Sequence, residues 1–237
     1  MTRIAVITDT HANLPALEAA LAAIGELGCE AIFHTGDAVG IGPSPQEVTD
    51  RLLHTPGVRL TMGNHDELCA FENPEPRPIW LDDRLAANAA WTRAHVDPGV
   101  RRAMATWPYE IVEVCSGWRI AFLHYPRDAG GDGFAGILPY PTRTDLDRLF
   151  AGQEANLILY GHHHPAADQV GRARYINPGS LGCGPMSEAR FTVVEFDQSE
   201  EPALRHHAVP YDRTPLHDAL VQREVPDHEF LRRAFFP

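Results

Sequence analysis

The sequence has no apolar run that approaches the roughly 18 residues needed to span a bilayer. Its N-terminus, residues 1–7, enters a strand pattern at once and lacks the apolar region and cleavage site of a signal peptide. Internal repeats and low-complexity segments are also missing. We therefore expect a cytoplasmic protein that neither spans nor binds a membrane.

Positive charge is scarce as well, since 20 Lys and Arg face 32 Asp and Glu and the net charge is −12. A negative field disfavours tight nonspecific binding to nucleic acid, because that affinity comes from neutralised phosphates. No basic track of the kind a nuclease uses is visible. A small phosphorylated substrate is not excluded, because bound divalent cations can reverse the sign of the charge in a pocket.

Cysteine is limited to four residues, which form neither a CxxC pair nor a zinc-ribbon spacing. Small buried thiols in a reducing compartment account for them. Histidine is more abundant than expected for the length, with 13 residues, and several of them follow strand-like runs.

The first third of the chain alternates between strand and helix patterns. Buried strands are expected over residues 3–8, 31–34 and 58–62, with one helix in each of the two intervals between them. Gly28 is expected to end the first helix. Ser44 is expected to cap the start of the second helix, with Pro45 at its first position. The order β-α-β-α-β favours a largely parallel sheet covered by helices.

The pattern changes after Asp66. A Pro-rich loop is expected over residues 73–78, followed by helices over 81–96 and 98–107, so that residues about 72–107 form a cap-like insert. Further on, residues 109–114 and 119–124 have the pattern of a β-hairpin, and residues 125–141, rich in Gly and Pro, that of a long loop near the site.

The last part of the chain has the pattern of a short helix over 142–151, a buried strand over 156–160, and late strands over 190–196 and 203–209 that suggest a second sheet. From about residue 212 onward we expect a helical, peripheral tail. Residues 1–237 are interpreted as one domain of α/β (α+β) class, with helices outside two packed sheets.

The tetrapeptide Gly63-Asn64-His65-Asp66 stands at the end of the third predicted strand. Gly63 is expected to let the backbone turn sharply without a steric penalty from a Cβ atom. Three polar side chains then follow at the carboxyl end of the strand, where open α/β sheets place their ligand sites. Taken alone, the tetrapeptide has an equally good explanation as an ordinary turn.

Four other strand ends have the same character, and their polar residues are Asp9, His11, Asp37, His124, His162 and His164. Each motif taken singly has an ordinary explanation, such as a turn or a solvated imidazole. Together they place carboxylate, amide and imidazole donors at one sheet edge, a set that suits Mn²⁺, Fe or Zn²⁺ better than a structural Cys-type zinc site. Seven candidate ligands fit two ions that share a carboxylate better than they fit one.

The ordered motifs D-x-H, G-D, G-N-H-D, H and G-H-x-H resemble the calcineurin-like metallophosphoesterase superfamily, from about residue 3 to residue 180. The stretches at residues 40–45 and 177–180 look like the small bacterial phosphodiesterase branch of that superfamily. The resemblance implies a four-layer αββα sandwich of two mixed sheets flanked by helices.

The resemblance also implies a dinuclear centre. Its metal ligands would be Asp9, His11, Asp37 and His164 for one ion, and Asp37, Asn64, His124 and His162 for the other, with Asp37 bridging. Mn²⁺ is the first choice of ion, and Fe, Zn²⁺ or Ni²⁺ are alternatives. A metal-bridging hydroxide would attack phosphorus, while His65, not a ligand, would face the leaving oxygen as proton donor or electrostatic stabiliser.

Two positions depart from the family pattern. Gly40 stands where the protein phosphatases of the superfamily have an acidic residue that orients the histidine equivalent to His65. Either Asp66 or another group orients His65 here, or its role as an acid is weaker. Tyr125 stands where the bacterial branch has Gly. This difference is expected to change the shape of the pocket and not the role of the neighbouring ligand, His124.

The sequence thus predicts a metal-dependent phosphoesterase acting on small phosphodiesters or phosphomonoesters. The alternative is a catalytically silent scaffold or binding module of the same fold, although every ligand position is filled. A protein phosphatase would use the same chemistry, but the Trp-containing insert and the loop from Tyr125 indicate a covered site.

Overall fold

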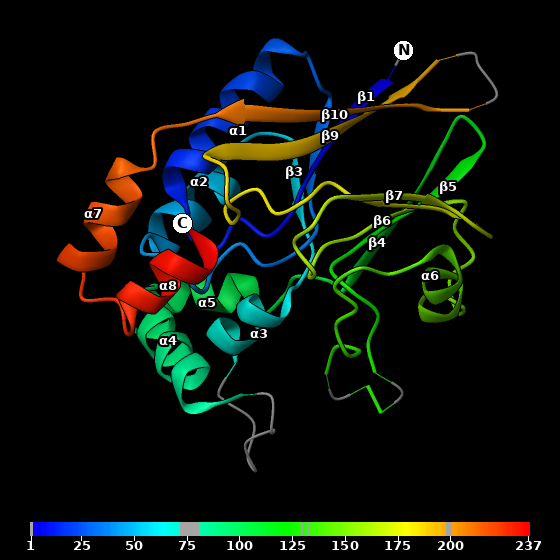
Figure 1. Ribbon diagram of the computed structural model, residues 1–237. Helices are drawn as coiled ribbons and strands as arrows, with labels where there is room; N and C mark the ends of the chain where they lie inside the picture. Colours follow the sequence, from blue (N-terminus) through cyan, green and yellow to red (C-terminus); the bar gives the residue numbers. More distant parts are fainter. Residues whose placement is uncertain (1, 72–80, 129, 132, 198–200) are drawn as a thin grey trace.

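The N-terminal half winds through β1 (Thr2–Ile7), α1 (Leu14–Glu26), β2 (Ala31–His34), α2 (Pro45–His54) and β3 (Val58–Leu60), which confirms the predicted β-α-β-α-β order. The computed structural model describes residues 2–71, 81–128, 130–131, 133–197 and 201–237 (Figure 1). The loop expected over residues 73–78 lies outside these ranges. Helix α1 begins where the Asn13 side chain accepts a hydrogen bond from the backbone amide of Ala16, 3.2 Å away.

The first sheet has the strand order β10-β9-β1-β2-β3, in which β1, β2 and β3 are parallel. Its other two strands are β9 (Glu188–Phe196) and β10 (Ala203–Pro210), which pair antiparallel with their neighbours. The prediction that these late strands begin a second sheet is therefore wrong. The sequence pattern of a strand shows which side chains it buries, but not which strand it pairs with. In the structure, β9 pairs with β1 and so belongs to the first sheet.

The second sheet has the order β4-β5-β6-β8-β7. The predicted hairpin is confirmed as β4 (Glu110–Cys115) and β5 (Trp118–Leu123), and β6 (Leu157–Leu159) lies parallel to β5. Strands β7 (Ala167–Val170) and β8 (Arg174–Asn177) were not predicted. They are four-residue strands in a polar stretch, too short for a clear alternation.

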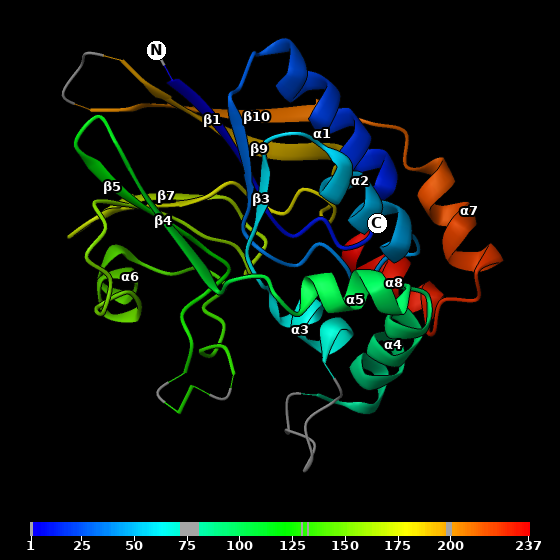
Figure 2. The ribbon, with the colours of Figure 1, turned by 180° about the vertical axis from the view of Figure 1, so that it is seen from behind.

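The two sheets pack face to face between layers of helices. Along β1, Ile4 and Val6 point to the second sheet, whereas Ala5 and Ile7 point to α1 and α2. The rings of Phe33 and Phe122 stack between the sheets with centroids 3.7 Å apart. Helix α6 (Arg143–Leu149) packs on the outer face of the second sheet (Figures 1 and 2). The predicted αββα sandwich is confirmed.

The remaining helices gather beside the sandwich at one end, as both ribbon views show. They are α3 (Asn64–Ala70), α4 (Asp83–Ala94), α5 (Pro98–Met104), α7 (Thr214–Gln222) and α8 (His228–Phe235). Helices α4 and α5 lie within the two predicted helical segments. The interpretation of residues 72–107 as a cap stays a prediction, because residues 72–80 lie outside the described part.

The C-terminal tail is helical, as expected, but it is not peripheral. Leu216, Leu231 and Phe236 are buried against Ile41 of the loop after β2. The Arg213 side chain donates to backbone carbonyls of Gly184, Met186 and the C-terminal Pro237. Apolar residues spaced along both short helices give the tail a face that must be buried, and the loops around the sheet edge supply the matching surface.

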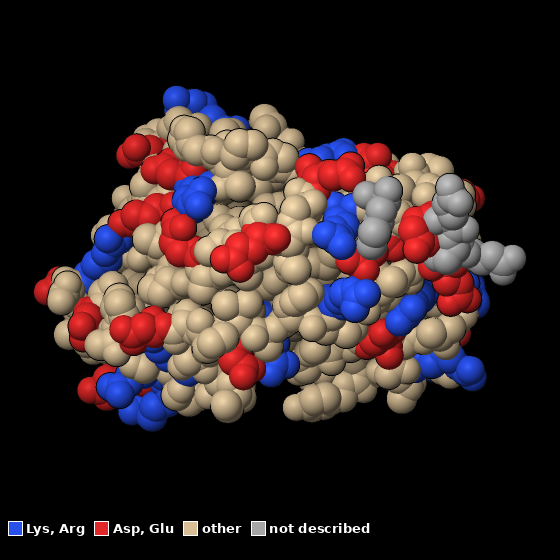
Figure 3. Space-filling model, turned by 90° about the horizontal axis from the view of Figure 1, so that it is seen from above, with Lys and Arg blue, Asp and Glu red and all other residues tan. Residues whose placement is uncertain are grey.

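Among the described residues, no helix is both long and apolar enough to cross a bilayer. On the face shown in Figure 3, acidic and basic side chains are intermingled and form no extended basic track.

Candidate metal centre

The seven side chains predicted as metal ligands meet at one edge of the sandwich. Asp9 and His11 follow β1, Asp37 follows β2, and Asn64 begins α3 after β3. His124 follows β5, and His162 and His164 follow β6. Because β1, β2 and β3 are parallel in one sheet and β5 and β6 in the other, their carboxyl ends deliver these residues to a common place.

His11 lies at the centre of the first group. Its Nε2 is 3.0 Å from Nε2 of His164, 3.7 Å from Oδ1 of Asp9 and 3.8 Å from Oδ2 of Asp37. The Asp9 carboxylate also accepts hydrogen bonds from the Thr8 hydroxyl and the His162 amide. Ring nitrogens and carboxylate oxygens therefore converge on one point.

His124 lies at the centre of the second group. Its Nε2 is 3.0 Å from Oδ1 of Asn64, 3.2 Å from Nδ1 of His162 and 3.3 Å from Oδ2 of Asp37. The same Asp37 oxygen thus faces both groups, and its Oδ1 accepts a hydrogen bond from the His65 amide at 2.8 Å. The Asp37 carboxylate therefore lies between the two groups of donors.

The orientation of the His124 ring is set by a backbone carbonyl. Its Nδ1 lies 2.8 Å from the carbonyl oxygen of Thr35, which can only accept, so Nδ1 donates. Donation from Nδ1 directs Nε2 toward the cluster, an arrangement typical of metal-binding histidines.

Backbone strain is concentrated at this site. Five of the seven side chains belong to residues with a positive φ: Asp9, His11, Asp37, His162 and His164. A left-handed conformation costs a residue with a Cβ atom on the order of 1 kcal/mol or more, and such strain persists where function demands it. The left-handed conformation of these five residues directs their side chains toward the cluster and lowers the local stability of the backbone.

Burial keeps most of the imidazoles neutral, because it lowers the pKa of His162 to about 3 and that of His164 to about 4. Neutral imidazole is the form that binds metals. His124 differs: burial opposes its charge, but the carboxylates of Asp37 and Asp9 outweigh burial and raise its pKa to about 9. Burial, with help from Asp37, also raises the pKa of Asp9 to about 7.

The donor set fits divalent cations. Asp9 and Asp37 are fully buried carboxylates, and the ion pairs between them and the described residues involve only histidines. The buried Nδ1 of His11 has no hydrogen-bond partner. Among the described residues no Arg or Lys pairs with these two carboxylates, and the protonated ring of His124 is the one positive charge beside them. Bound cations would supply the further positive charge that such burial favours.

His65 lies beside the cluster, with its ring edge-on to that of His11 and the centroids 5.0 Å apart. Asp66, one of the groups considered for orienting this ring, is engaged elsewhere. Its carboxylate accepts hydrogen bonds from the backbone amides of Asp37, Val39 and Gly63. The His65 ring instead lies against Gly40, where an added Cβ atom would be 2.4 Å from its Nδ1.

Gly63 is needed for a reason other than the one expected. Its φ of −102° is open to any residue, so no turn demands glycine there. An added Cβ atom would, however, lie 2.2 Å from the backbone nitrogen of Asp37. The absence of a side chain allows the loops after β2 and β3 to touch, which brings Asp37 and Asn64 together.

One neighbour of the cluster was missed by sequence reasoning, the thiol of Cys183. A ligand atom from each of His11, His164 and Cys183 falls within 4.8 Å of the others. Burial raises the pKa of this thiol well above its usual range. A lone cysteine without a motif gives no signal in the sequence, because its place depends on the loop after β8.

Two further residues, His163 and Tyr125, pack beside the candidate ligands and are not themselves candidate ligands. His163, which stands between two candidate ligands, packs on Tyr160 with ring centroids 5.3 Å apart, and its Nδ1 lies 3.2 Å from the side-chain nitrogen of Asn177. Tyr125, the unusual residue after His124, is buried beside His162, and its hydroxyl accepts a hydrogen bond from the Leu138 amide. It therefore supports a ligand and fastens the loop over residues 125–141.

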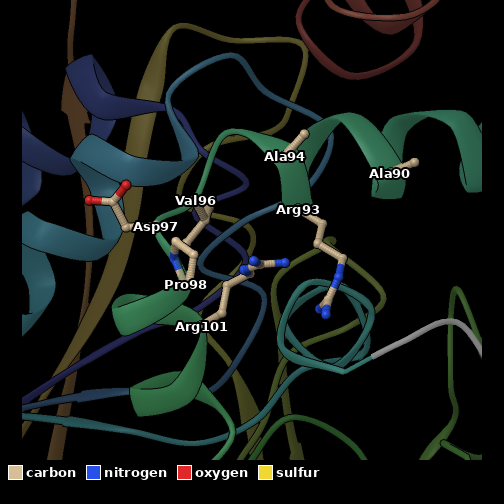
Figure 4. A pocket seen from close by; sticks show the side chains of 7 residues that line it. All are labelled: Ala90, Arg93, Ala94, Val96, Asp97, Pro98 and Arg101. Carbon is tan, nitrogen blue, oxygen red and sulfur yellow. The ribbon is translucent and has the colours of Figure 1, made fainter.

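The cluster opens into a cavity of about 420 Å³ that Asp37, Asn64, His65, His162 and His164 help to line. A second cavity, of about 490 Å³, lies between α4 and α5 and is lined by Ala90, Arg93, Ala94, Val96, Asp97, Pro98 and Arg101 (Figure 4). None of the candidate ligands lines it, and its Arg93 donates to backbone carbonyls near the end of α3. The first cavity is the candidate substrate site.

The chain is similar to a known domain family and to a protein of another organism. The model of the calcineurin-like phosphoesterase superfamily domain matches residues 2–200. An uncharacterised protein of Methanocaldococcus jannaschii is 26% identical over 94% of each chain.

Two solved structures share the fold. A hypothetical protein from Pyrococcus horikoshii superposes with a TM-score of 0.83 at 24% identity, over 100% of this chain and 99% of that one. A metallophosphoesterase from Sphaerobacter thermophilus superposes with a TM-score of 0.71 at 21% identity, over 98% and 97% of the two chains.

Proposed function

Because the chain belongs to the calcineurin-like phosphoesterase superfamily, we propose that it is a metal-dependent hydrolase of small phosphodiesters or phosphomonoesters with a dinuclear centre. The observation that carries the proposal is the position of Asp37, whose Oδ2 lies within 3.8 Å of His11 Nε2 and 3.3 Å of His124 Nε2. One carboxylate oxygen faces two separate groups of donors, as a shared ligand of two cations would.

The first ion would be held by Asp9, His11, Asp37 and His164, and the second by Asp37, Asn64, His124 and His162. Two such ions, when bound, supply positive charge for the phosphoryl oxygens and lower the pKa of the water that acts as nucleophile. Mn²⁺ is the first choice, because the donors are oxygen and imidazole nitrogen.

His65 would act on the ester oxygen that leaves. Its ring lines the cavity, and burial lowers its pKa, so the ring is neutral near pH 7 and offers an N–H donor. A donor aimed at developing charge stabilises the transition state more than the ground state. Its contact with Gly40 keeps the ring in place, which makes Gly40 a positioning residue.

The other contribution of the chain is a preorganised frame. The Thr35 carbonyl orients His124, and the Asp66 carboxylate ties the loops after β2 and β3 together. Such a frame needs no rearrangement when charge develops, and therefore lowers the barrier.

The test is hydrolysis of bis-p-nitrophenyl phosphate by protein stripped of metal and then reloaded with Mn²⁺. We expect no activity in the stripped protein and recovery on reloading, with about two ions per chain by elemental analysis. Activity that survives exhaustive chelation would contradict the proposal.

The second candidate is a binding module that keeps the fold without catalysis. The filled ligand set and the presence of His65 count against it. Protein that binds no divalent ion in the same elemental analysis would favour the binding module.

A further inference from the structure

The cavity beside the ligand cluster has two kinds of wall. One wall consists of four candidate ligands, Asp37, Asn64, His162 and His164, together with His65 and His163. The other is apolar and comes from four parts of the chain that are distant in sequence: the loop after β2, helix α4, the loop over 125–141, and helix α8. Its apolar members are Ile41, Leu85, Ile137, Phe230, Leu231 and Phe235.

The polar groups on the apolar side are already engaged within the protein. Asn88 accepts a hydrogen bond from the Ile41 amide, and Asp82 accepts one from the Leu85 amide. Arg84 pairs with Asp227 and stacks over the Phe230 ring at 3.9 Å. Among the described residues that line the cavity, no uncommitted cation is left for a second anionic group of a substrate.

The apolar wall begins next to a ligand. The ring of Phe235 lies 6.2 Å from that of His164, centroid to centroid. Phe235 and His164 also line another cavity of about 420 Å³, which contains Ser180, Cys183 and Arg190. A phosphodiester has two ester arms, and the two cavities that share Phe235 offer a separate place for each.

We propose that the cavity lined by Leu85, Ile137 and Phe235 is the subsite for one uncharged, apolar ester arm of a phosphodiester. The proposal rests on the phosphoesterase function proposed above and names its substrate class. Because His65 lines the same cavity, the arm held there is the leaving alcohol. Substrates with a second phosphate or a carboxylate on that arm are disfavoured, since the wall would desolvate that charge without pairing it.

The test uses phosphonates, which bind without being hydrolysed. Binding of methylphosphonate, phenylphosphonate and 2-carboxyethylphosphonate to the Mn²⁺-loaded protein is measured by calorimetry. Burial of a phenyl ring should make phenylphosphonate bind roughly tenfold to a hundredfold more tightly than methylphosphonate. The carboxylate compound should bind more weakly than phenylphosphonate by at least the same factor.

Leu85→Ala and Ile137→Ala should remove most of the gain for phenylphosphonate and leave methylphosphonate binding unchanged. Ile137 is about half exposed, so its substitution spares the fold. Val221→Ala, at an exposed position of α7 outside the cavity, is the matched control and should keep the full ratio.

Equal binding of phenylphosphonate and methylphosphonate by the parent protein would overturn the subsite, as would a ratio that both variants preserve. Either result leaves the proposed function standing, since that function is tested by metal content and by hydrolysis of bis-p-nitrophenyl phosphate. Loaded protein that neither hydrolyses this diester nor binds any of the phosphonates would instead contradict both.

Discussion

The imidazole of His65 lies directly against the backbone of Gly40. A Cβ atom on Gly40 would be 2.4 Å from Nδ1 of His65 and 2.8 Å from its Cβ, closer than any real contact. Gly40 also has a φ of +80°, a conformation that favours glycine. Among the described residues no side-chain hydrogen bond holds this ring, so steric contact rather than a carboxylate sets its position.

Gly40→Ala should displace the His65 ring and lower kcat by about a hundredfold, because displacement by an ångström has that order of effect. Metal content should stay unchanged, since the three atoms nearest to the added Cβ all belong to His65 and not to a candidate ligand. Gly117→Ala is the matched control: its φ is +83°, but nothing lies within 4 Å of the added atom. Both variants carry the backbone strain, and only the first should lose turnover.

Asp37→Asn should lower metal content and activity together, because the Asp37 oxygen faces both groups of donors. We expect fewer than one ion per chain by elemental analysis and almost no hydrolysis of bis-p-nitrophenyl phosphate. Asp168→Asn, at a surface aspartate paired with Arg174, should retain both ions. Normal metal content in Asp37→Asn would show that the carboxylate is not shared.

His65→Ala should retain the metals and reduce kcat by a factor of about 10² to 10³, the usual cost of removing one hydrogen-bond donor aimed at developing charge. Elemental analysis and steady-state kinetics on the same preparation separate the two effects. If His65→Ala loses its metals, the ring is a ligand and not the group that acts on the leaving oxygen.

Metal affinity should rise with pH. In the metal-free protein the carboxylates of Asp37 and Asp9 outweigh burial and raise the pKa of His124 to about 9, so Nε2 holds a proton that an ion must displace. Between pH 7 and pH 9 the affinity should increase about tenfold per pH unit, with one proton released from this ring. Calorimetry in buffers of different ionisation enthalpy measures the release.

The raised pKa of His124 should make the metal-free protein less stable, not more stable, as the pH rises. A raised pKa stabilises the folded state below the ordinary value of 6.5, and this contribution is lost as the pH rises through 9. Metal affinity that does not change over this pH range would show that His124 is neutral before the ion binds.

Asp66→Ala should lower the free energy of unfolding by about 3 kcal/mol or more. The substitution leaves three buried backbone amides, those of Asp37, Val39 and Gly63, without an acceptor, at ~1–3 kcal/mol each. Urea unfolding measures the loss. Asp66→Asn retains one acceptor oxygen, so its free energy of unfolding should fall by less. Equal stability of Asp66→Ala and the parent protein would contradict the role of Asp66 in joining the two loops.

The ligand cluster was predictable because its residues are marked locally. Asp9, Asp37 and Asn64 each follow an apolar run, and parallel strands bring their carboxyl ends to one edge whatever the rest of the chain does. Periodicity likewise predicted the helices, since the apolar spacing that defines α1 is a property of neighbouring residues.

The arrangement of β9 and β10, the place of Cys183 and the position of α8 beside the site were decided by tertiary structure alone. Each depends on contacts between segments that are more than a hundred residues apart in sequence. The hydrogen bond from the Asn13 side chain to the Gly182 carbonyl is one such contact. Sequence patterns record what a segment must bury, and only the folded chain determines what buries it. The sequence by itself therefore determined which residues are candidate ligands, because each lies in a local motif. Only the tertiary structure decided the shape of the candidate substrate cavity, because its walls come from segments that are distant in sequence.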